Sequence, residues 1–131
     1  MGIRFSESTI KASFLVQNPD WYNYECTQVL EKAAASGTSK NYILIFEGRQ
    51  TPGGTDEMNG VPVSKLVSEK ADWIMYPIAV AANNGEDLPA GTDFDPKSLK
   101  GITLTARTVR GQRQDGSPMN DLVEFRPMRT Q

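Results

Sequence analysis

The chain has 131 residues, of which 38% are apolar, and its net charge is −2. This length suits a single domain with its own hydrophobic core, so we expect one domain over residues 1–131. The chain contains no histidine, which excludes Ser-His and Cys-His catalytic systems and zinc sites of the usual Cys/His kind.

We therefore expect a protein that is not an enzyme and that carries no cofactor or metal. Cys26 is the single cysteine, so no internal disulfide can form, and we expect it to serve packing. No apolar run approaches the length that crosses a bilayer, and the start of the chain lacks the hydrophobic segment of a signal peptide. These features predict a cytoplasmic protein with no membrane partner.

Three strands are expected in the first third of the chain. The run 10–16 is typical of a short strand, and 22–32 of a longer one. Alternation places three residues on one face of the longer strand: Tyr22, Tyr24 and Cys26. The polar turn 36–40 leads to residues 42–47, the most hydrophobic strand, which we expect to form a hairpin with 22–32.

The middle of the chain predicts a loop, a helix and an acidic connection. Residues 50–60 are glycine-rich without the spacing of a phosphate-binding motif, so we expect a mobile surface loop. From residue 63 apolar residues recur every three or four positions, which predicts an amphipathic helix over 63–75 that Pro77 ends or kinks. The acidic connection covers 83–97, where we expect Asp93 and Asp95 to serve turns and caps rather than calcium.

The last third predicts a basic β-hairpin. Two strand-like runs, 101–110 and 119–125, flank a turn over 112–118 that contains Asp115-Gly116. From Lys100 onward there are six Lys or Arg residues and three acidic ones, a local charge of +3. A basic hairpin on an acidic chain favours a local surface for a polyanion. A strand face that is merely solvated is the alternative interpretation.

The expected order is three strands, a helix and two strands. This order is compatible with a mainly β fold, an OB-like five-stranded barrel with one helix between strands 3 and 4. A split β-sandwich and an α+β roll share the same order of elements and stay open. The fold alone would not establish a function.

Two segments resemble small phage-encoded proteins related to single-stranded DNA-binding proteins. One runs from Phe94 through the step Leu99-Lys100-Gly101 to Ala106 and continues after the turn from Met119 to Pro127. The other, Tyr24 to Glu47, contains a Ser-Gly-Thr-Ser-Lys turn before an apolar strand. The resemblance implies an OB-like fold that binds single-stranded DNA in the host cytoplasm, as an accessory of replication or recombination. The chain departs from many of these proteins because it does not end in an acidic tail.

Binding of this kind combines basic side chains on phosphates with aromatic rings that stack on bases. The candidates in this sequence are Lys100, Arg107, Arg110 and Arg113 for the phosphates, and Trp21, Tyr22, Tyr24 and Tyr42 for the bases. Tyr24 and Tyr42 also suit the core, since aromatic burial stabilises small domains. Trp21 is the aromatic residue most readily placed on the surface.

A protein-interaction module is the alternative function, for instance a phage component that binds a host or virion protein. Its surface would be the acidic connection, with Glu86, Asp87, Asp93 and Asp95. Exposed edge strands can also pair between subunits, so a homodimer is compatible with either function.

Overall fold

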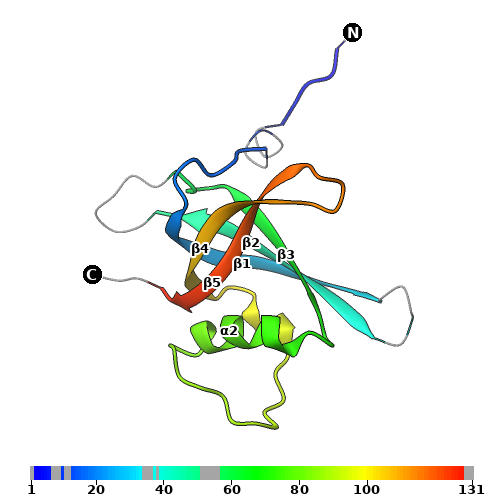
Figure 1. Ribbon diagram of the computed structural model, residues 1–131, viewed down its shortest axis with the longest axis vertical. Helices are drawn as coiled ribbons and strands as arrows, with labels where there is room; N and C mark the ends of the chain where they lie inside the picture. Colours follow the sequence, from blue (N-terminus) through cyan, green and yellow to red (C-terminus); the bar gives the residue numbers. More distant parts are fainter. Residues whose placement is uncertain are drawn as a thin grey trace.

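Five antiparallel strands form one sheet in the part of the chain that the computed structural model describes, residues 2–6, 10, 13–33, 37, 39–50 and 57–128 (Figure 1). The elements are β1 (Asp20–Ala33), β2 (Lys40–Arg49), β3 (Pro62–Ser68), helix α2 (Asp72–Ala82), the 3₁₀ helix η1 (Pro96–Leu99), β4 (Thr103–Gln112) and β5 (Pro118–Pro127). The prediction of a mainly β fold with five strands and a helix between strands 3 and 4 is confirmed.

The strands lie in the order β3-β2-β1-β4-β5, with the long strand β1 at the centre. Strand β1 pairs with β2 on one side and with β4 on the other, and β4 pairs with β5. Both predicted hairpins are therefore confirmed. A bulge in β1 between Cys26 and Gln28 adds twist to the sheet, because an extra residue on one strand bends it.

The core lies between the inner face of the sheet and α2. The large side chains that are completely buried on the inner face include Tyr24, Leu44, Phe46, Leu104 and Leu122. The ring of Tyr24 meets that of Phe46 edge-on, with centroids 6.4 Å apart. Helix α2 lies beneath the sheet in Figure 1 and buries Ile78, Ala79 and Ala81. Removal of this apolar surface from water is the main force that holds helix and sheet together.

The two edges of the sheet, β3 and β5, approach each other. The ammonium of Lys65 on β3 donates hydrogen bonds to the Leu122 carbonyl (2.9 Å) and to Asp121 Oδ1 (3.2 Å), both on β5. The sheet is thus curled strongly enough for a side chain to connect its edges. Backbone pairing between the described residues still stops at β3 and at β5.

The expected helix over 63–75 is wrong in its first half. Residues Pro62–Ser68 form β3, and α2 begins at Asp72 and continues through Pro77 to Ala82. Val63 and Val67 lie opposite Phe46 and Tyr42 on β2, whereas Leu66 between them is exposed. A spacing of four residues suits one face of a strand as well as one face of a helix, and the pairing with β2 decides between them.

The expected strand over 10–16 is also wrong for its described residues. Ile10 is helical and residues 13–16 belong to no strand. Side chains hold this segment instead: the Asn120 amide accepts from Val16 N (2.7 Å) and donates to the Phe14 carbonyl (2.8 Å). Arg110 Nε donates to the Val16 carbonyl (2.6 Å). We call Asn120 and Arg110 the N-terminal clamp.

Most of the expected surface loop over 50–60 lies outside the described residues, which omit 51–56. In its described part Met58 is completely buried, whereas Asn59 is exposed, so this part lies at the surface but is anchored by one core side chain. A β-carbon on Gly48 would lie 1.7 Å from the Met58 carbonyl oxygen, which explains why a glycine occupies this position in β2. The turn 57–60 therefore packs directly on the β2 backbone.

Candidate nucleic-acid interface

The outer face of β1, β4 and β5 carries half-buried aromatic and basic side chains. On β1 the residues of this face alternate with the buried Tyr22 and Tyr24. Residues that lie opposite each other on two antiparallel strands point to the same face of the sheet. Trp21 lies opposite Arg107, and Thr105 opposite Arg126. Trp21, Arg107 and Arg126 therefore gather on one face from three neighbouring strands.

Trp21 and the two arginines are arranged as a stacked and ion-paired group. The guanidinium of Arg126 lies over the indole of Trp21, 4.1 Å from the ring centroid, a cation–π contact. Arg107 Nε donates to Glu124 Oε1 at 2.6 Å, and these side chains are 40% and 55% exposed. We call Trp21, Arg107, Glu124 and Arg126 the outer-face cluster. It presents a guanidinium stacked on a half-buried indole, next to the partly exposed side chain of Arg107.

The face continues onto β2 through Arg49. Arg49 pairs with Glu47 (2.9 Å) and Glu25 (3.5 Å). Beside it Thr105 Oγ1 donates to Asn23 Oδ1 (2.6 Å), and both residues are buried in the face. Three arginines and three glutamates thus lie close together and carry no net charge between them, and ion pairs or stacking hold the guanidinium groups.

The four predicted basic residues do not gather on one surface. Lys100 precedes β4, and Arg113 lies in the turn after it, where Arg113 Nη1 donates to the Pro118 carbonyl (2.9 Å). Because a strand rises about 3.3 Å per residue, these two are separated by the length of β4. Arg110 serves the N-terminal clamp. Of the four, only Arg107 belongs to the outer-face cluster.

Two of the predicted stacking residues are core residues. Tyr24 is completely buried and its hydroxyl lies 2.6 Å from Thr108 Oγ1. Tyr22 is 9% exposed, and its hydroxyl bonds to the Asn18 carbonyl and to Glu57. Neither ring offers a face to a base, and this corrects their assignment. The inward alternation that places them with Cys26 is the physical reason.

The other two aromatic candidates lie apart. Trp21 is half-buried on the outer face, whereas Tyr42 is half-buried at the edge of the core and lines a groove beside α2. Arg126 and Arg49 were not among the candidates. They share a face with Trp21 only through strand register, which is shifted by the bulges in β1 and β5. A sequence does not show where bulges occur.

Cys26 and Asp95, side chains of types used in catalysis and metal binding, have structural roles. Cys26 is buried, as expected for packing, and burial raises the pKa of its thiol, which disfavours the nucleophilic thiolate. Asp95 accepts a hydrogen bond from Lys97 N at the start of η1, so its predicted cap role is confirmed. In the residues described, no group of three or more acidic or cysteine side chains is arranged to hold a metal ion.

Among the described residues there is no helix with the length and apolarity required to pass through a bilayer. No protein-family model matches the chain, and no curated protein has a matching sequence.

Proposed function

We propose that this protein is a non-catalytic single-stranded DNA-binding protein, an accessory of phage-type replication or recombination that acts in the host cytoplasm. The proposal rests on one observation above all: the outer-face cluster places Trp21 and Arg126 in a stack, with Arg107 beside them. Aromatic rings and guanidinium planes are the surfaces on which unpaired bases stack.

We infer further that the curled sheet is an OB-like barrel. Three features support this: the five-strand order, the helix between β3 and β4, and the contact of Lys65 with the opposite edge. OB folds are small, partly open barrels, and their surfaces commonly bind oligonucleotides. The resemblance to phage proteins in the last third of the chain favours the same interpretation.

In the proposed mechanism a base stacks on the layer that Arg126 and Trp21 form. A neighbouring phosphate then replaces Glu124 as the partner of Arg107, since both anions accept hydrogen bonds from the same guanidinium. In the free protein Glu124 holds the Arg107 guanidinium in an ion pair. Because a duplex hides its base faces, this arrangement favours single strands.

The test measures fluorescence anisotropy of a labelled oligo-dT, with a duplex of equal length, at roughly 50 and 200 mM salt. We expect single-strand binding that weakens as the salt rises. Trp21→Ala should weaken binding about 5- to 150-fold, since a base stack is worth about 1 to 3 kcal/mol. Arg107→Glu should weaken it at least as much.

The matched control is Lys70→Glu, the same charge reversal on an exposed residue between β3 and α2. It should leave oligo-dT binding nearly unchanged. Absence of binding at low salt, equal affinity for duplex, or equal losses in Lys70→Glu and Arg107→Glu would each contradict the proposed function.

A further inference from the structure

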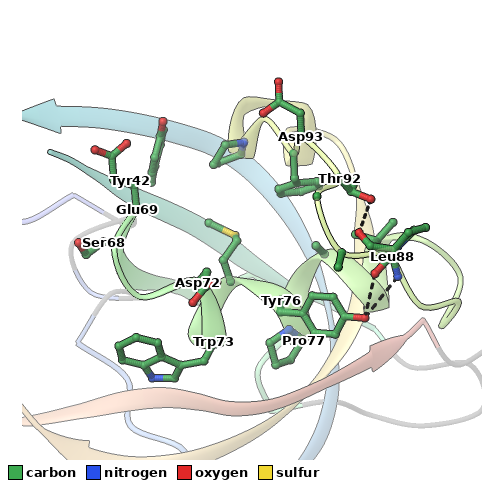
Figure 2. Close-up of a pocket in the computed structure, with 17 residues that line it drawn as sticks. Tyr42, Ser68, Glu69, Asp72, Trp73, Tyr76, Pro77, Leu88, Thr92 and Asp93 are labelled. Carbon is green, nitrogen blue, oxygen red and sulfur yellow. Dashed lines mark hydrogen bonds between the residues drawn. The ribbon is translucent and has the colours of Figure 1, made fainter.

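An open groove of about 780 Å³ lies between α2, the end of β3 and the loop 88–96 (Figure 2). Four aromatic side chains contribute to its lining: Tyr42, Trp73, Tyr76 and Phe94. Trp73 is 69% exposed and Tyr76 is 44% exposed. Large apolar side chains held outside the core in this way mark surfaces that contact another molecule.

The walls of the groove are tied together. The Tyr76 hydroxyl of α2 accepts a hydrogen bond from Leu88 N (3.3 Å) and lies 3.4 Å from the Leu88 carbonyl, as the dashed lines in Figure 2 show. Within the loop, Thr92 N and Oγ1 both donate to the Pro89 carbonyl. The loop is therefore anchored to the helix, and the groove exists before any partner arrives.

The charge of the groove is negative. Glu69, Asp72 and Asp93 line it, and none of the described lining residues is a lysine or arginine. The nearby ammonium groups of Lys40 and Lys97 both bind Glu31, at 2.9 and 3.1 Å, rather than these carboxylates. Residues 68–96 as a whole contain six acidic residues and one lysine. Such a surface repels phosphate and attracts cations.

We propose that this groove binds a peptide segment of a partner protein that bears arginine or lysine between apolar residues. Carboxylates pair with the cationic groups, and the rings of Trp73 and Tyr76 accept cation–π and apolar contacts. The volume lies in the range of specific binding pockets. This function goes beyond DNA binding, because the groove uses other residues and carries a charge that excludes nucleic acid.

The first measurement uses two fluorescein-labelled octapeptides, one that alternates arginine with leucine and one that alternates glutamate with leucine. The first should bind with an affinity that falls as salt rises, and the second should not bind. Trp73 reports the site directly: in a Trp21→Phe background its fluorescence should change when the arginine peptide binds, since the chain has two tryptophans.

Two double variants locate the interaction. Asp72→Asn/Asp93→Asn should weaken the arginine peptide about tenfold or more, since two ion pairs with aligned partners are lost. The matched control is Glu86→Gln/Asp87→Asn, which removes the same charge from exposed residues of the same connection that do not line the groove. It should change the affinity less than twofold.

Three results would overturn the proposal: no binding of the arginine peptide, equal losses in the two double variants, or no response of Trp73. The first variant should keep the secondary-structure spectrum of the unaltered protein, and the Trp73 response provides a test that needs no carboxylate variant. Oligo-dT binding should be unchanged or slightly stronger in Asp72→Asn/Asp93→Asn, because repulsion of phosphate is reduced, so the two proposals can fail independently.

Discussion

Glu57 fixes the entry into β1 through four hydrogen bonds. Its Oε1 accepts from the backbone N–H groups of Gln17 and Asn18 and from the Tyr22 hydroxyl, and its Oε2 accepts from the Asn18 amide. Burial alone would raise the pKa of this carboxyl group. The hydrogen bonds from Asn18, Tyr22 and Gln17 outweigh burial and hold the pKa below its ordinary value of 4.5.

This lowered pKa predicts a pH-dependent contribution to stability. A carboxyl group with a lower pKa in the folded state stabilises the fold above its unfolded pKa, and the stabilisation is lost as the pH falls through the folded pKa. Glu57→Gln should lower the free energy of unfolding by about 1 kcal/mol at neutral pH. The difference from the unaltered protein should shrink as the pH falls below 4.5.

Urea unfolding followed by tryptophan fluorescence at neutral pH and at several acidic values checks this expectation. Glu86→Gln, which removes an exposed carboxylate, is the control and should show no such convergence. A difference between Glu57→Gln and the unaltered protein that stays constant with pH would show that the carboxylate charge is irrelevant.

At the level of elements, Lys65 is the residue that connects the two sheet edges. Lys65→Met keeps the aliphatic stem and removes the ammonium that bonds to Leu122 and Asp121. We expect the free energy of unfolding to fall by about 1 to 2 kcal/mol and amide exchange to become faster in β3 and β5. Lys70→Met, at an exposed lysine, should do neither. Unchanged exchange in both edge strands would contradict the inferred barrel.

The elements show where sequence reasoning succeeds and where it stops. Both hairpins are predictable, because alternation and turn residues are local signals. Strand β3 is not predictable in this way, because the spacing of Val63 and Val67 fits a helix equally well. Only their pairing with β2 distinguishes strand from helix. The N-terminal segment shows the reverse error, a predicted strand that is not one. Val16 is buried like a strand residue, but its backbone is hydrogen-bonded by the side chains of Asn120 and Arg110. Non-local contacts decide both cases.

On the scale of the whole molecule, the two proposed surfaces belong to different elements and suit opposite charges. The outer-face cluster lies on β1, β4 and β5, and the acidic groove is lined largely by α2 and the loop that follows it. The sequence indicates that basic and acidic residues are segregated along the chain, but it does not indicate which residues meet in the outer-face cluster. Arg107 and Trp21 were predictable, whereas Arg126, 105 positions from Trp21 in the chain, joins them through register alone.

The N-terminal clamp has a consequence for the kinetics of folding. Its hydrogen bonds join residues 94, 104 and 106 positions apart. They therefore close a loop that includes most of the chain and require β4 and β5 to exist first. Interactions that form after the folding barrier influence the rate of unfolding rather than that of folding. Asn120→Ala should therefore speed unfolding about tenfold and leave refolding unchanged in stopped-flow experiments, unlike the exposed control Gln112→Ala. Slower refolding would instead assign the clamp to the nucleus, and the first residues of the chain would then help to start the fold rather than lock it.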